Sequence, residues 1–204
     1  SVLDDEIAWY ENLGGGTFGA QQVITSSADG AWSVYAADLD GDGDEDVLSA
    51  SYNDDKIAWY ENLGGGSFGA QQVITTGALS ARSVYATDLD GDGDADVLSA
   101  SYYDCKIAWY ENLQDGFAAP QIISSNTDGA TSVYATDLDG DGDADVLSAS
   151  YYDDRIAWYE NLGGGAFGLQ QTITTSADGA QSVYAADLDG DGDADVLSAS
   201  VLDD

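Results

Sequence analysis

The chain of 204 residues contains very few basic residues and no histidine. Lys and Arg number 4 against 39 Asp and Glu, so the formal net charge is −35 at pH 7. This balance argues against nucleic acid as a partner, because phosphate contacts need Lys and Arg, and it disfavours anionic lipid surfaces for the same reason. No apolar run is long enough for membrane insertion. The partner that the composition favours is a small cation that binds carboxylates, Ca²⁺ or Mg²⁺.

The chain also has a single cysteine, Cys105, and no methionine. An intrachain disulfide is therefore excluded. Without histidine, zinc sites and nucleophile–histidine dyads lack their usual ligands, so we expect a protein that is not an enzyme. We expect Cys105 to be a free thiol at an exposed turn, with an interchain bridge as the alternative. Because Ser1 is not an encoded start, we expect a mature chain or a piece of a longer one.

The sequence consists of one unit that is repeated along the chain. Trp9, Trp59, Trp109 and Trp158 follow one another at intervals of 50, 50 and 49 residues. The motifs I-A-W-Y-E-N-L and D-V-L-S-A-S each occur four times. We expect a single domain over residues 1–204, whose first and last units together complete one repeat. The units span approximately residues 1–32, 33–82, 83–131, 132–181 and 182–204.

Each unit has the pattern of four short strands. In one unit these strands are predicted at residues 33–39, 46–52, 56–63 and 68–75. The third strand is apolar on both faces, with Ile57 and Trp59 on one and Ala58 and Tyr60 on the other. Such a sheet must be covered on both faces, which stacked neighbouring sheets achieve. The sequence predicts an all-β fold, a β-propeller of four blade-equivalents with four antiparallel strands each. A flat array of sheets or a β-sandwich is the alternative.

The two ends of the chain share the phrase S-V-L-D-D. The N-terminus supplies the third and fourth strands of a unit, and the C-terminus supplies the first and second. Joining them would complete a blade and remove exposed sheet edges. A closed four-blade monomer, an eight-blade dimer and a longer array or filament, with self-association end to end, all remain open.

Four nine-residue loops concentrate the acidic residues, the first reading D-L-D-G-D-G-D-E-D. Each has Asp at positions 1, 3, 5, 7 and 9 and Gly at 4 and 6. Calcium takes six to eight hard oxygen ligands, and glycine allows the tight turn that brings carboxylates together. We expect about four Ca²⁺ ions, one per repeat, held by the side chains at positions 1, 3, 5 and 9 and the backbone carbonyl at position 7. A hydrophilic Asp-Gly turn is the alternative. The predicted metal-binding residues are Asp38, Asp40, Asp42, Asp44, Asp46, Asp88, Asp90, Asp92, Asp94, Asp96, Asp137, Asp139, Asp141, Asp143, Asp145, Asp187, Asp189, Asp191, Asp193 and Asp195.

The pattern D-x-D-G-D-G-x-x-D before a strand, with F-G-A-Q-Q or F-A-A-P-Q in the same unit, resembles the FG-GAP/VCBS repeat family. The resemblance covers essentially the whole chain. The family includes the calcium-bearing propeller of integrin α-subunits and some fungal propeller lectins. It implies a propeller with calcium between the first and second strands of each blade, and extracellular or cell-surface binding. Integrin-like propellers usually have seven blades, so the four units here leave blade number and closure open.

A candidate ligand surface lies on the face opposite the acidic loops. One position before the first strand differs in every unit, and the turn after the second strand carries tyrosines. The candidate residues are Trp32, Arg82, Thr131, Gln181, Tyr103 and Tyr152. We expect an extracellular adhesion or recognition module for a protein or glycan ligand. A structural subunit of an extracellular filament or surface assembly is the first alternative, and a non-catalytic domain of a larger secreted enzyme is the second.

Overall fold

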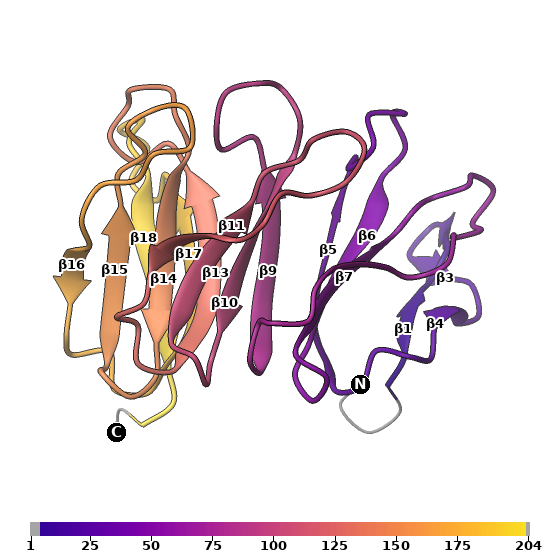
Figure 1. Ribbon diagram of the computed structural model, residues 1–204, viewed down its shortest axis with the longest axis horizontal. Coiled ribbons are helices and arrows are strands. Elements are labelled where there is room, and N and C mark those ends of the chain that lie inside the picture. Colours follow the sequence, from indigo (N-terminus) through magenta and orange to yellow (C-terminus); the bar gives the residue numbers. More distant parts are fainter. Residues whose placement is uncertain (1–4, 203–204) are drawn as a thin grey trace.

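The computed structural model describes residues 5–202, which form β-strands joined by turns and contain no helix. Three four-stranded antiparallel sheets, which we call sheets A, B and C, stand side by side in chain order (Figure 1). A two-stranded half-sheet flanks them at each end. No helix in the described part of the chain is long and apolar enough to cross a membrane.

Consecutive strands are neighbours within each of the three four-stranded sheets. Sheet A contains β5 (Ala31–Ala37), β6 (Asp46–Ser51), β7 (Lys56–Tyr60) and β8 (Gln72–Thr75). Sheet B contains β9 (Ala81–Thr87), β10 (Asp96–Ser101), β11 (Lys106–Tyr110) and β12 (Gln121–Ser124). Sheet C contains β13 (Ala130–Thr136), β14 (Asp145–Ser150), β15 (Arg155–Tyr159) and β16 (Gln171–Thr174). The N-terminal half-sheet pairs β1 (Ile7–Trp9) with β4 (Gln22–Thr25), beside the hairpin of β2 (Asn12–Gly14) and β3 (Thr17–Phe18). The C-terminal half-sheet pairs β17 (Ala180–Ala186) with β18 (Asp195–Ser200).

The predicted all-β architecture with repeated four-stranded sheets is confirmed, but a closed ring is not seen. In the described residues β1 pairs only with β4, and β18 pairs only with β17. The two half-sheets lie at opposite ends of an open row of sheets (Figure 1). The predicted division into one domain and its unit boundaries stays a prediction.

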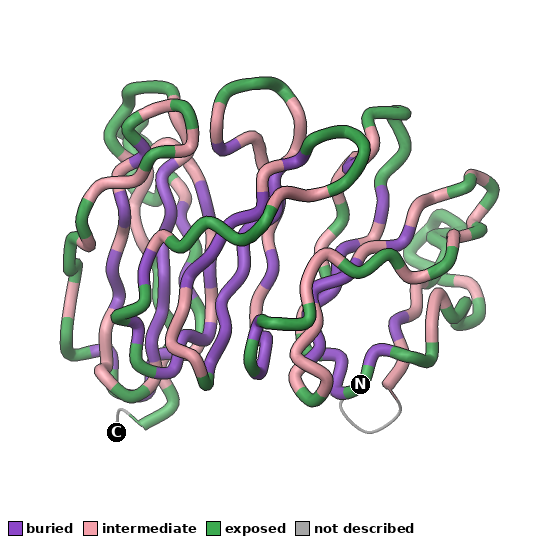
Figure 2. The backbone as a smooth tube through the Cα atoms, viewed as in Figure 1, coloured by how far each residue is buried: buried purple, intermediate pink, exposed green. Residues whose placement is uncertain are grey.

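The hydrophobic core lies between the sheets, as expected for strands that are apolar on both faces. At the boundary of sheets A and B, Leu48 and Ile57 pack with Val84 and Val97, all of them buried. Buried residues follow the middle of the strands, whereas the exposed residues concentrate in the loops at the edges (Figure 2). Each fully buried Leu or Val contributes about 1.5–3 kcal/mol. The core is therefore one apolar layer per sheet boundary, repeated along the row.

A turn with one left-handed residue connects the second and third strands of each sheet. Asp55 and Asp154 occupy this position with φ of 59° and 52°, and Cys105 occupies it in sheet B with φ of 58°. The Asp55 carboxylate accepts a hydrogen bond from the Ser80 amide (2.7 Å), and the Asp154 carboxylate accepts one from the Gly179 amide (2.9 Å). Cys105 places its thiol 3.8 Å from the Asp128 carboxylate instead. Sheet B thus lacks a turn-to-link bond that its neighbours have.

Replacing Cys105→Asp is expected to stabilise the chain by about 1 kcal/mol, because a carboxylate there would accept the Gly129 amide as in the other units. Asp also tolerates the left-handed region better than most residues. The midpoint of thermal unfolding should rise by about 2–4 °C. Cys105→Ala, which adds no acceptor, is the control. If both variants melt at the same temperature, the missing hydrogen bond has no effect on stability.

Candidate functional site

The four acidic loops connect the first and second strands of sheets A, B and C and of the C-terminal half-sheet. In the loop of sheet B, Asp88 accepts hydrogen bonds from the amides of Gly91 (2.7 Å) and Gly93 (3.0 Å). These glycines have φ of 84° and 98°, a left-handed backbone that other residues rarely adopt. The same pair of bonds recurs in the other three loops. The aspartate at position 1 therefore shapes the loop around its own carboxylate.

The aspartate at position 9 ties the loop to the strands behind it. In sheet B, Asp96 is buried and accepts the Leu89 amide (2.9 Å) and the Asn112 amide (2.8 Å). Asp46 and Asp145 make the corresponding two bonds. Because Asn112 lies just beyond the third strand, this carboxylate fixes the loop relative to the whole sheet.

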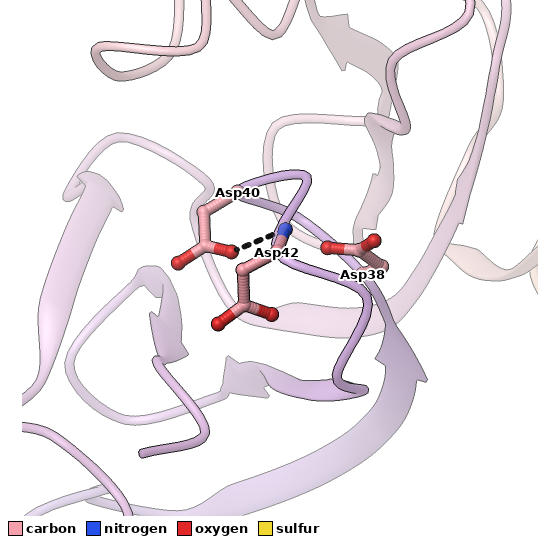
Figure 3. A group of neighbouring side chains, drawn as sticks. All are labelled: Asp38, Asp40 and Asp42. Atoms are coloured by element: carbon pink, nitrogen blue, oxygen red, sulfur yellow. Dashed lines mark hydrogen bonds between the residues drawn. The ribbon is translucent and has the colours of Figure 1, made fainter. Parts of the chain in front are cut away.

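Carboxylates from each loop converge, with one oxygen from each residue of the group within 4.8 Å of the others. Figure 3 shows Asp38, Asp40 and Asp42 turned toward a common space, with Asp40 accepting the Asp42 amide (3.2 Å). Positions 1 and 3 take part in all four groups, position 5 in the first, and position 9 in the other three. The groups are Asp38, Asp40 and Asp42; Asp88, Asp90 and Asp96; Asp137, Asp139 and Asp145; and Asp187, Asp189 and Asp195.

The remaining predicted metal-binding residues lie in the same loops but outside these groups. They are Asp44, Asp46, Asp92, Asp94, Asp141, Asp143, Asp191 and Asp193. The position-7 carboxylates point elsewhere in at least one loop, since Asp94 accepts a hydrogen bond from Gln114 (3.0 Å). This hydrogen bond agrees with the prediction that position 7 coordinates the ion through its backbone carbonyl. That role of the carbonyl stays a prediction. Glu45 is exposed, as expected for a residue outside the pattern.

Like charges crowd these groups. Burial, and to a smaller extent the neighbouring Asp90 and Asp92, raise the pKa of Asp96 to about 6, against two backbone hydrogen bonds that lower it. The pKa values of Asp46 and Asp145 are raised by burial in the same way. A divalent cation would remove this electrostatic cost.

The ion pairs of the basic residues do not neutralise the carboxylates of the acidic loops. Lys56, Lys106 and Arg155 pair with Asp54, Asp104 and Asp153 at distances of 2.8, 2.9 and 3.1 Å. Those pairs lie at the turns after the second strands, at the other edge of the sheets. Calcium–oxygen bonds of about 2.3–2.6 Å place ligands on opposite sides of the ion at roughly twice that distance. Donor type, spacing and charge therefore fit a hard divalent cation in each loop.

The opposite edge of sheets A to C carries a cluster that we call the aromatic surface, formed by Trp32, Tyr52, Arg82, Tyr102, Tyr103 and Tyr152. The Arg82 guanidinium lies 3.6 Å from the ring centroid of Tyr102, 4.9 Å from that of Trp32 and 5.5 Å from that of Tyr52. Ring contacts extend the cluster from Tyr52 to Tyr103 (6.2 Å) and from Tyr102 to Tyr152 (5.4 Å). Trp32, Tyr103 and Tyr152 are exposed. The cluster thus offers exposed aromatic rings to solvent, with the half-buried Arg82 packed among them.

The structure brings together four of the six predicted ligand-surface residues, Trp32, Arg82, Tyr103 and Tyr152. Thr131 does not belong to the surface, because it is buried with its hydroxyl 3.0 Å from the Ala149 carbonyl and 2.9 Å from that of Ala180. Gln181 is half-buried on β17, in the C-terminal half-sheet.

Two members of the aromatic surface, Tyr52 and Tyr102, are not among the predicted residues. Tyr52 ends the strand predicted at residues 46–52, whereas in the structure both tyrosines begin the turn after their strands. The aromatic pair Tyr102 and Tyr103 was the available signal, because one ring of such a pair can support the other at a turn.

The family model described as FG-GAP-like repeat matches the chain four times, at residues 1–49, 38–99, 88–148 and 137–198. No curated protein matches the sequence significantly.

The solved structures that resemble the fold include the following two. One is an Agrocybe aegerita lectin, described as recognising non-reducing terminal N-acetylglucosamine, with a TM-score of 0.66 and 21% identity over 96% of this chain and 55% of the lectin chain. The other is the V. cholerae biofilm matrix protein Bap1, with a TM-score of 0.50 and 22% identity over 87% of this chain and 25% of that protein. The chain therefore spans about half the length of the first and a quarter of the second.

Proposed function

Because the chain belongs to the family of FG-GAP-like repeats, we propose that it is a non-catalytic, extracellular recognition module that binds carbohydrate and is stabilised by calcium. The observation that carries this proposal is the aromatic surface, where exposed Trp32, Tyr103 and Tyr152 belong to one cluster with Arg82. A sugar ring presents an apolar C–H face and a rim of hydroxyls. The aromatic faces complement the first, and the guanidinium and phenol groups complement the second.

The charge of the chain narrows the ligand class. With a net charge of −35, the protein repels anionic glycans at long range, so a neutral saccharide is the favoured ligand. The lectin of similar fold, whose described ligand is terminal N-acetylglucosamine, supports a neutral sugar. The lectin and the biofilm matrix protein also support an extracellular or surface location. The acidic loops lie at the other edge of the sheets, and their proposed role is to bind calcium and so stabilise the fold.

Binding to neutral oligosaccharides tests this proposal. The chain, in calcium-containing buffer, is applied to a glycan array, and the strongest neutral ligand is titrated by calorimetry. Trp32→Ala and Tyr152→Ala are each expected to weaken binding by about 2 kcal/mol, roughly 30-fold, as for central aromatic contacts. Leu169→Ala is the control, because Leu169 is highly exposed in the link before β16 and outside the aromatic surface. An array without neutral ligands, or aromatic variants that bind like the parent, would contradict the proposal.

A structural role in an extracellular assembly is the second candidate function. The uncovered strands of the two half-sheets and the resemblance to a biofilm matrix protein favour it. The two functions are compatible, because the aromatic surface and the half-sheets are different parts of the molecule.

A further inference from the structure

The half-sheets at the two ends of the chain are complementary. The N-terminal half-sheet has the third and fourth strands of a sheet, and the C-terminal half-sheet has the first and second. In sheet A, the second strand pairs with the third along its length, with Leu48 opposite Trp59 and Ala50 opposite Ile57. β18 and β1 carry the same sequences at these positions but have no such partner in the described residues.

The exposure of β18 shows what it lacks. Leu197 is 38% exposed, whereas the equivalent Leu48, Leu98 and Leu147 are fully buried at 0%. All six residues of β10 and of β14 are buried, but none of β18 is. The sequence D-V-L-S-A-S is the same in all three strands, so the difference comes from missing neighbours alone.

The N-terminal end shows the matching deficit. Tyr10 is 53% exposed and its equivalent Tyr60 is 0% exposed, while Val34 on β5 is 57% exposed against 4% for Val84 on β9. A cavity of about 400 Å³ opens between β1 and β5, lined by Ile7, Ala8 and Val34 among others. In the complete boundaries, the first two strands of one sheet pack against the first strand of the next. The cavity therefore lies where the first two strands of a preceding sheet would be.

Polar groups at the same two surfaces also lack the bonds that recur inside the chain. At each internal boundary a serine hydroxyl accepts the amide of a valine in the next sheet: Ser33 with Val84 (3.4 Å), Ser83 with Val133 (3.2 Å) and Ser132 with Val183 (3.3 Å). The next serine in the series is Ser182, and Val34 is the valine whose amide has no such serine partner among the described residues. At two of the boundaries, the side-chain amide of an asparagine also donates to a loop carbonyl of the preceding sheet. These bonds run from Asn112 to Leu39 and from Asn161 to Leu89, both at 2.8 Å.

We propose that two copies of this chain join head to tail, with β18 of each copy adding to β1 of the other. The register of β6 with β7 carries over directly, which places Leu197 opposite Trp9, Ser198 opposite Ala8 and Ala199 opposite Ile7. The β17–β18 hairpin fills the cavity beside β5 of the other copy, and Ser182 accepts the Val34 amide. Three complete sheets from each copy and two composite sheets give a closed ring of eight sheets.

The arrangement of the sheets favours a second copy over self-closure. β1 and β18 of one chain lie at opposite ends of the row (Figure 1). The row superposes on 55% of the lectin chain, so that chain of similar fold is nearly twice as long as this row of sheets. A head-to-tail interface of this kind forms a ring when its rotation closes. Mutual repulsion of two chains of charge −35 opposes the contact, and about 0.15 M salt and bound calcium reduce that repulsion.

The mass of the 204-residue chain in solution tests the proposal, measured by light scattering in calcium and 0.15 M salt. The expected mass is twice the chain's 21.2 kDa. Leu197→Asp and Val34→Asp should each lower the mass to that of one chain, whereas Leu169→Asp should leave it unchanged because Leu169 lies outside the half-sheets. A parent chain of single mass would overturn the proposal and leave the half-sheets to be covered by further repeats. Species that grow with concentration would also overturn it, in favour of an open array.

A disulfide test checks the register without relying on destabilising variants. In a Cys105→Ser background, Ser198→Cys and Ala8→Cys would lie directly opposite each other, at about the Cβ separation that a disulfide requires. Mild oxidation should give two-chain species on a non-reducing gel. Ser198→Cys with Glu11→Cys, which the register keeps apart, should give far less. A two-chain mass without the expected crosslink would mean that another surface holds the copies together and would overturn the proposal.

Discussion

Removing calcium with a chelator is expected to lower the midpoint of thermal unfolding by tens of degrees. At free calcium about 100-fold above the dissociation constant, each site stabilises the folded chain by about 2.7 kcal/mol. Four such sites in one row of sheets contribute roughly 10 kcal/mol, comparable to the whole stability of an ordinary domain. Since about 1 kcal/mol corresponds to 2–4 °C in a chain of this size, the shift should be roughly 20–40 °C.

The physical reason is that the loops place like charges together. The carboxylates of Asp88, Asp90 and Asp96 each present an oxygen within 4.8 Å of the other two. Without a cation, these charges repel one another at the edge of the sheet. With calcium bound, the same oxygens would become ligands, and the hydrogen bonds that Asp96 accepts from Leu89 and Asn112 would transmit the fixed loop geometry to the strands.

Differential scanning calorimetry with and without EDTA measures this effect. A matched pair of variants distinguishes metal binding from loop structure: Asp90→Asn removes a carboxylate from the group, whereas Asp94→Asn changes one outside it. Both retain an amide oxygen that can accept a hydrogen bond. Asp90→Asn should weaken calcium affinity at that loop about tenfold or more, and Asp94→Asn should change it little. A melting temperature that EDTA leaves unchanged would contradict the role of calcium.

Local structure could be predicted from the sequence because it is encoded within each unit. The repeated pattern of strands and turns predicted the four strands of each unit, and the spacing of Asp and Gly predicted the loops whose carboxylates converge. Which of positions 5, 7 and 9 contribute a carboxylate to the converging group could not be predicted, because this depends on which side chains accept hydrogen bonds from backbone amides. Asp96, for example, is held by an amide from beyond the third strand.

The ligand surface was predicted only in part because its key position is a β-bulge. The register shifts at Ala81 and Ser83 leave Arg82 between paired positions, and the equivalent shift at Ala130 and Ser132 leaves Thr131. A bulge changes the direction in which its side chain points, so the length of the side chain decides whether it reaches the aromatic surface. The long Arg82 side chain reaches the aromatic rings, whereas the Thr131 hydroxyl is satisfied by nearby carbonyls and stays buried. Closure of the ring could not be predicted from the sequence either, because it depends on the curvature accumulated over all the sheets.

Replacing the buried Asn161→Ala is expected to destabilise the chain by about 3–5 kcal/mol, lowering the melting midpoint by roughly 10–15 °C. Asn161 is 1% exposed, and its amide donates to the Leu89 carbonyl in sheet B (2.8 Å) and to the Ala144 carbonyl in its own sheet (3.1 Å). Its carbonyl oxygen accepts the Gly163 amide (3.1 Å). Alanine would leave three backbone groups without these partners, and each buried loss costs about 1–3 kcal/mol.

The position of Asn161 explains why its loss should spread beyond one turn. The bond to Leu89 joins residues 72 positions apart and crosses the boundary of sheets B and C, so it couples the acidic loop of one sheet to the next sheet. Asn126→Ala is the control, because Asn126 is exposed and its side chain makes only a long bond to Gln170 (3.4 Å). That variant should change stability by less than about 0.5 kcal/mol. Equal urea midpoints for the two variants would show that the asparagine bonds that recur between the sheets contribute nothing measurable to stability.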